Sequence, residues 1–373
     1  MKGTALVLTG FSLIAITYGM ARFAWGLMMP DVMHTIPLTP RISGVLSASS
    51  FAAYCVAVML APMLTSRAGP RFSAMVAALC AATGLLLLAS AASPWLLGAG
   101  LFIAGLSAGL ASPALADAVS QRIESRQQPQ MNTAINAGTS MGIMLSVPIL
   151  FWLPGGWRVA CALFALLALI CILPVWRQLP GKSDAARHSS WLSTMRQRSL
   201  QRLIVIALIS GIASAAWWSF GPDLLHHIDV NASVVSLLWL VGGAAGILGA
   251  LTGPMAKWIG MNAVYRLSLC GMSLLLLLLA LSHHYAWWLF PAVALGGAAY
   301  VTLSGVLLVW GAEATAHSPA SGVGIVFFML AAGQVIGSLL FGQVYASAGA
   351  ASALLLFAAL PLAMLFLTPA KTD

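Results

Sequence analysis

Residues 18–34 read YGMARFAWGLMMPDVMH, and residues 210–226 read SGIASAAWWSFGPDLLH. The two stretches share Gly, Trp, Pro, Asp and His, each 192 positions apart. They differ in charge at one position, because Arg22 of the first copy is replaced by Ser214 in the second. A repeat of this length divides the 373 residues into two halves, an arrangement typical of secondary transporters. The single arginine breaks the symmetry and is therefore the first candidate functional residue.

The composition identifies an integral membrane protein. Hydrophobic residues make up 61% of the chain and charged residues only 7%, whereas a soluble domain has about 25% charged residues. A membrane-spanning helix needs about 20 mainly apolar residues, and the apolar runs here are long and continuous, which favours helices over a barrel. We predict twelve spans, six in each half: 4–29, 42–64, 72–92, 95–116, 131–152, 157–176, 202–222, 232–254, 263–282, 286–311, 320–344 and 349–368.

The predicted fold class is thus an all-α integral membrane protein with two pseudo-symmetric six-helix bundles. We expect an N-terminal bundle in residues 1–176, a cytoplasmic linker in 177–201 and a C-terminal bundle in 202–373. The linker is polar and basic. Of the 17 Lys and Arg residues, only Arg41 and Arg158 fall in loops of the opposite side, so the positive-inside rule places both termini in the cytoplasm.

This charge distribution also bears on location and partners. We expect a multi-pass protein of a bacterial-type inner membrane, because the first apolar run is too long for a cleaved signal peptide. The net charge of +9 lies in short loops, which indicates contact with anionic lipid rather than nucleic acid. We expect a monomer.

Neither catalysis nor a cofactor is indicated. No nucleophile, base and oxyanion-binding group form a recognisable set, so we expect a protein that is not an enzyme and has no cofactor or metal. The cysteines read as small core residues of the predicted spans. A zinc site built from His226, His227 and Asp229 is the one metal alternative, and nothing in the sequence fixes its geometry.

Two motifs resemble a known family. The loop at residues 62–71 reads PMLTSRAGPR and is similar to the G-x-x-x-D-R-x-G-R-R loop of the major facilitator superfamily, although Pro62 and Ser66 replace its glycine and aspartate. Residues 18–30 resemble the Y-G-x-A-R-F-x-x-G-L-x-x-P opening of the YbfB/YjiJ-type branch of that superfamily. The resemblance covers the whole chain and implies twelve helices in two bundles, together with transmembrane transport by alternating access.

Arg22 is the candidate that stands independently of any family. It lies roughly 7 Å from the middle of its predicted helix, where exposure to lipid costs about 2.5 kcal/mol or more. Tyr18, four residues before it, and Trp25, three residues after it, keep helical spacing, so their rings can lie beside the guanidinium. Two readings remain open: Arg22 reaches the membrane interface as a structural residue, or it binds an anion.

An anion is favoured by the placement of acidic residues, because no Asp or Glu falls in the middle of a predicted span. An arginine without a fixed counter-ion suits a substrate carboxylate, which it can hold through two parallel hydrogen bonds. Polar residues at helical spacing single out Tyr54 and Asn136, and the resemblance to the superfamily implies that helices carrying further aromatic and polar residues of the second half flank a central cavity. The candidate substrate-binding residues, besides Arg22, are Tyr18, Trp25, Tyr54, Asn136, Trp217, Trp218, Tyr300 and Gln334.

Charged residues at the span ends suggest coupling and gating. Asp31, Asp223 and His226 are coupling candidates if protons are the second partner, and solvated loops are the alternative. For gating, Asp117 and Glu313 end predicted spans beside loops that carry Arg67 and Lys257, so each half can close an ion-pair latch. Helix-end charges that only set topology would explain the same pattern.

The function that best fits these features is movement of a small organic anion across the inner membrane by symport, exchange or facilitated diffusion. Its small-molecule substrate is expected to be anionic. The alternative is proton-driven efflux of amphipathic compounds or drugs, for which the aromatic residues would matter and Arg22 would be structural.

Overall fold

The computed structural model describes residues 2–124, 126–182, 195, 198–315 and 319–368. Within these ranges every element is a helix. The helices of the first half are α1 (Lys2–Ile14), η1 (Ala15–Phe23), α2 (Ala24–Thr35), α3 (Pro40–Ala89), α4 (Pro94–Arg122), α5 (Gln128–Asn136), α6 (Gly138–Trp152) and α7 (Gly156–Gln178). Those of the second half are α9 (Arg198–His227), α10 (Ala232–Gly246), η2 (Ile247–Leu251), α11 (Thr252–Ile259), α12 (Met261–Leu281), α13 (Leu289–Glu313) and α14 (Pro319–Ala363).

The described residues form ten continuous helical segments that are long and apolar enough to cross a membrane. Two of these, α3 and α14, are each a pair of helices joined at a glycine, so the ten segments contain twelve helices. Gly69 has a φ of 86° and Gly349 a φ of 83°, a backbone conformation that glycine adopts without the steric cost of a Cβ. The predicted fold of twelve helices in two pseudo-symmetric bundles is therefore confirmed.

Contacts between helices divide the chain into two compact units. Unit 1 comprises Met1–Leu38 and Ser49–Arg187, and unit 2 comprises Thr39–Ala48 and His188–Asp373. Of the predicted linker, residues 183–194 and 196–197 lie outside the described residues.

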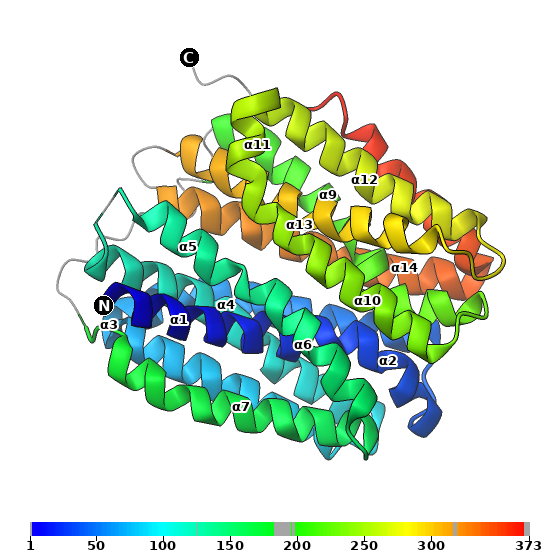
Figure 1. The fold of residues 1–373 in the computed structure, drawn as a ribbon, viewed down its shortest axis with the longest axis horizontal. Helices are drawn as coiled ribbons and strands as arrows, with labels where there is room; N and C mark the ends of the chain where they lie inside the picture. The colour runs from blue at the N-terminus through cyan, green and yellow to red at the C-terminus, as the bar shows by residue number, and fades with distance from the viewer. Residues whose placement is uncertain (1, 125, 183–194, 196–197, 316–318, 369–373) are drawn as a thin grey trace. The chain divides into compact units, whose positions relative to one another are not determined.

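Unit 1 is built around its first span. Figure 1 shows α1 and α2 as parts of one continuous helical segment, and the turns between them, η1, are a π-helix. This segment packs on α4, α5, α6 and α7. A Cβ added at Gly19 would clash with the backbone of Gly142 in α6. The two helices therefore touch backbone to backbone, as small residues allow in membranes.

Unit 2 has a similar close contact between its first helix and α14. A Cβ at Gly211 in α9 would meet the carbonyl oxygen of Leu330, and one at Gly333 in α14 would meet that of Leu208. The core of unit 2 gathers residues of α9, α12, α13 and α14. It includes Tyr265, whose ring centroid lies 5.1 Å from that of Trp310. The paired glycines thus support the repeat seen in the sequence.

Residues 39–48 at the start of α3 belong to unit 2. A Cβ added at Gly44 would lie 2.5 Å from the carbonyl oxygen of Ser338, and one at Gly342 would lie 2.5 Å from that of Pro40. The beginning of α3 is therefore packed closely on α14.

Candidate functional site

Arg22 lies in the π-helical turn of the first span. The N–H of Ala24 bonds to the carbonyl oxygen of Gly19, five residues earlier, so the turn is wider than an α-helical one. The α-helical spacing expected for Tyr18, Arg22 and Trp25 is wrong at this turn, because a π-turn inserts an extra residue. Such turns are rare and occur frequently at functional sites. Nothing in the sequence marks it, since Gly19 alone does not distinguish a π-turn from an α-helix.

Four aromatic rings surround the Arg22 guanidinium. Its central carbon lies 4.3 Å from the ring centroid of Tyr54, 4.8 Å from that of Phe51, 5.2 Å from that of Phe23 and 5.7 Å from that of Tyr18. These distances are within cation–π range. The Arg22 side chain is only 7% exposed. We call these five residues the Arg22 cage; they come from the first span and from α3 within unit 1.

Hydrogen bonds fix part of the Arg22 cage. The Tyr18 hydroxyl donates to the hydroxyl of Tyr54 at 3.2 Å and lies 2.8 Å from the hydroxyl of Ser112 in α4. The Tyr18 and Tyr54 rings meet edge to face, with centroids 5.9 Å apart. Three helices therefore hold the rings against which the guanidinium rests.

The structure brings together some predicted residues of unit 1 and adds others. Tyr18 and Tyr54 join Arg22, whereas Phe23, Phe51 and Ser112 were not predicted. Phe51 could have been found, because it shares a helical face with Tyr54, three residues later. Trp25 is buried, and Asn136 is exposed at the end of α5.

A second polar and aromatic set lies in unit 2 around Ser214, the counterpart of Arg22. The buried Gln334 amide donates to the Ser214 hydroxyl at 3.3 Å and to the Tyr300 hydroxyl at 3.1 Å. Beside them the rings of Trp218 and Tyr300 lie 5.3 Å apart, and Trp239 packs against both Trp217 and Trp218. The structure thus brings together four predicted residues, Trp217, Trp218, Tyr300 and Gln334, and adds Ser214 and Trp239.

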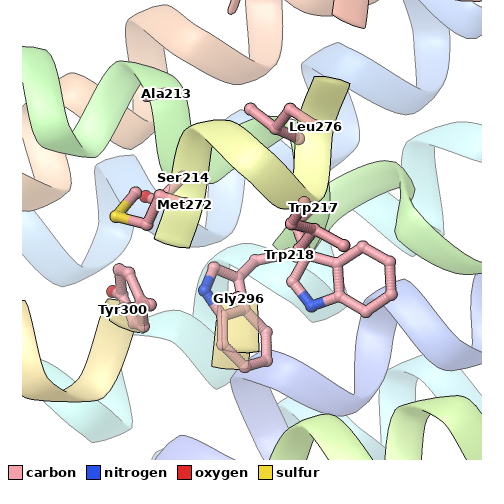
Figure 2. A pocket seen from close by; sticks show the side chains of 9 residues that line it. Ala213, Ser214, Trp217, Trp218, Met272, Leu276, Gly296 and Tyr300 are labelled. Atoms are coloured by element: carbon pink, nitrogen blue, oxygen red, sulfur yellow. The ribbon is translucent and has the colours of Figure 1, made fainter. Parts of the chain in front are cut away.

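The space enclosed by this set is small. Figure 2 shows Met272 and Tyr300 on one side of the pocket and the two indole rings on the other. Its cavity of about 10 Å³ has room for roughly one water molecule. In this conformation the set is therefore packed rather than open to a substrate.

The residues of the predicted latches lie near the helix ends. Arg67, Lys257 and Glu313 are exposed, while the half-buried Asp117 accepts a hydrogen bond from the Gln121 amide at 3.0 Å. The latches stay a prediction.

Arg71, in the same loop as Arg67, has a defined role. Its side chain donates to the carbonyl oxygen of Leu179 at 2.9 Å, and its backbone N–H donates to that of Pro180 at 3.1 Å. Arg71 thereby fixes the segment that follows α7.

The two copies of the repeated aspartate differ in their surroundings. Asp31 is exposed, as is His34. Asp223 is half-buried and accepts a hydrogen bond from the Tyr345 hydroxyl of α14, and His226 is half-buried nearby in α9. Proton coupling through these residues stays a prediction. Among the described residues, no group of three or more His, Cys, Asp or Glu side chains could hold a metal.

Comparison with known proteins gives both a family and a fold. The model of the Major Facilitator Superfamily matches residues 11–338. A mutant structure of the nucleoside transporter NupG is similar, with a TM-score of 0.78 at 14% identity, covering 97% of this chain and 98% of that chain. Another NupG structure gives a TM-score of 0.74 at 17% identity, covering 98% and 97%. At these identities the likeness shows the fold alone.

Proposed function

Because the chain belongs to the major facilitator superfamily and is therefore a membrane transporter, we propose that it moves a small organic anion with a carboxylate group by alternating access. The membrane is proposed to be a bacterial-type inner membrane, with both termini in the cytoplasm. Residues 1–176 and 202–373 act as the two moving halves, joined by residues 177–201. Assignment to the YbfB/YjiJ-type branch stays a prediction.

The observation that carries the proposal is the buried charge of Arg22. All eight acidic residues of the chain lie outside the middle of the spans, and burial of a cation in a membrane protein is costly. The Arg22 cage offsets part of that cost with about 0.5–2 kcal/mol per cation–π contact. A substrate carboxylate would supply the opposite charge.

The cage also suits the geometry of carboxylate binding. The four rings restrict the directions in which the guanidinium N–H groups can point. Arginine holds a carboxylate through two parallel N–H···O bonds. The rings thus orient the guanidinium before the anion arrives, which lowers the entropic cost of binding.

The alternative function is proton-driven efflux of amphipathic compounds. The indole rings of Trp217, Trp218 and Trp239 support it, because large aromatic side chains bind apolar bodies without charge selection. The same rings, with the Gln334 amide, would also suit a flat hydrogen-bonding molecule such as the nucleosides that NupG is named for. Both classes belong in the test.

The test measures thermal stabilisation of the purified protein by a panel of carboxylates, nucleosides and lipophilic cations. A ligand that binds the folded state raises stability by RT ln(1 + [L]/Kd). We expect one carboxylate to stabilise the wild type, Arg22→Lys to weaken the effect and Arg22→Ala to abolish it. Arg41→Ala is the matched control, because Arg41 is exposed.

A hit must then be taken up by liposomes that contain the protein. Uptake unchanged in Arg22→Ala would refute the role of Arg22. Stabilisation of the wild type and Arg22→Ala alike by lipophilic cations alone would favour efflux.

A further inference from the structure

Each unit contains a sharp helix joint at a glycine. In unit 1, Gly69 joins the two arms of α3 with a φ of 86° and a ψ of 164°. In unit 2, Gly260 joins α11 to α12 with a φ of 83° and a ψ of 146°. Both glycines have a positive φ, which glycine adopts without the steric cost of a Cβ. They stand 191 positions apart, so the two halves of the chain repeat the same joint.

A short segment covers the joint of unit 1. Residues 179–182 follow α7, and we call them the strap. A Cβ added at Gly69 would lie 2.5 Å from the backbone nitrogen of Lys182 and 2.8 Å from the carbonyl carbon of Gly181. Leu179, the first residue of the strap, is fully buried. The strap therefore passes so close to the joint that only a glycine fits beneath it.

Two hydrogen bonds from one residue fasten the strap. The Arg71 side chain donates through Nε to the carbonyl oxygen of Leu179 at 2.9 Å, and the Arg71 backbone N–H donates to that of Pro180 at 3.1 Å. Arg71 lies in the first turn of the arm that follows Gly69, where backbone N–H groups have no partner within the helix. The strap thus supplies a hydrogen-bond acceptor that the start of this arm needs.

The joint of unit 2 differs in its cover. A Cβ added at Gly260 would meet nothing within 4 Å, and Gly260 is exposed whereas Gly69 is buried. Asn262 stands at the position that corresponds to Arg71, again 191 residues later, and it is exposed. Within the part of the chain that the structure describes, only the first of these two joints is covered.

This difference bears on how each joint can move. Hinges between packed elements are a few residues that absorb changes of φ and ψ, and glycine has the widest range of both. A rotation at Gly69 disturbs the strap, its two bonds from Arg71 and the buried Leu179. A rotation at Gly260 disturbs no such cover. Local opening costs more free energy where more buried contacts and hydrogen bonds are lost.

We propose that the strap locks the Gly69 joint, so that unit 1 keeps a rigid turn there while the Gly260 joint of unit 2 acts as a hinge. The lock lies within unit 1 and does not depend on the transported substrate. It also gives the motif at residues 62–71 a physical role. The glycine of the motif admits the strap, and its last arginine fastens it.

Hydrogen exchange of the full chain in detergent micelles tests the lock. Mass spectrometry of overlapping peptides follows the amides of residues 71 and 262, corrected for the intrinsic exchange rate of each sequence. In the wild type we expect the amide of Arg71 to exchange at least about tenfold more slowly than that of Asn262, because the strap carbonyl protects it.

Two variants loosen the strap from different sides. Arg71→Ala keeps the backbone N–H and removes the side-chain bond, so faster exchange at residue 71 reports release of the strap. Gly69→Ala adds a Cβ beneath the strap and should have the same effect. Arg71→Lys retains a donor and should restore most of the protection. Asn262→Ala is the matched control in unit 2 and should leave residue 71 unchanged.

Equal exchange at residues 71 and 262 of the wild type would overturn the proposal, as would unchanged exchange at residue 71 in Arg71→Ala. Faster exchange spread evenly over all helices of Arg71→Ala would overturn it as well, because Arg71 would then support the whole fold rather than the joint. The comparison within the wild type stands even where a variant fails to fold.

Discussion

The energetic link between Arg22 and Tyr54 can be measured directly. Of the four rings of the Arg22 cage, that of Tyr54 lies nearest the guanidinium, at 4.3 Å, and Tyr54 is 3% exposed. Replacing Tyr54 with leucine removes this ring and also the hydroxyl that bonds Tyr18. The single variant therefore mixes a cation–π contact, a hydrogen bond worth about 0.5–1.5 kcal/mol and a change of packing.

A double-mutant cycle separates these effects. In an Arg22→Met background the charge is gone, while the hydrogen bond and the packing change remain the same to a first approximation. We expect Tyr54→Leu to cost about 0.5–2 kcal/mol more in the wild type than in Arg22→Met, which is the size of one buried cation–π contact. The free energy of unfolding is measured by titrating micelle-bound protein with a denaturing detergent and following helix content.

Tyr265→Leu provides the control cycle. Tyr265 is a buried tyrosine of unit 2 whose hydroxyl donates to the carbonyl oxygen of Met364 at 3.1 Å. Its coupling to Arg22→Met should lie within about 0.5 kcal/mol of zero. A Tyr54 coupling as small as that of Tyr265 would refute the view that the rings stabilise the charge.

Two further predictions concern packing and gating. Gly142→Ala should lower stability and shift the π-helical turn, because the added Cβ meets the carbonyl oxygen of Ala15. Gly253→Ala, which has nothing within 4 Å of its new Cβ, should be neutral or stabilising by about 0.5–1 kcal/mol. Thermal unfolding of both variants checks this, and equal losses of stability would contradict it. If Asp117 and Arg67 form a latch, charge reversal at either should lower transport in liposomes and the double reversal should restore it; a double variant as inactive as the singles would rule the latch out.

The fold could be predicted from the sequence because it depends on patterns along one chain. Apolar length gives the spans, and the repeat from Gly19 to His34 gives the two halves. The two helix pairs joined at Gly69 and Gly349 were predicted as separate spans, because the apolar runs are interrupted there. Such features need no knowledge of which helix faces which.

The candidate site was predicted only in part, because it depends on contacts between helices. Arg22 stood out as a charge in an apolar span, and Tyr18 as its neighbour on that span. Phe51 and Ser112 come from α3 and α4, and an ordinary Phe or Ser in a span carries no mark of its partner.

The repeat itself shows where the chemistry of the two units diverges. Gly19 and Gly211 make the same kind of backbone contact, with Gly142 in α6 and Gly333 in α14. Three residues after each glycine stand Arg22 and Ser214. The first meets aromatic rings, and the second meets the Gln334 amide.

The π-turn occurs only in the copy that carries the charge, among the described residues. The wider turn alters the direction of the residues beyond Gly19, and with it the place of the guanidinium among the rings. The local backbone of the first copy is thus adapted to hold a cation, while the regular helix of the second suffices for a hydroxyl.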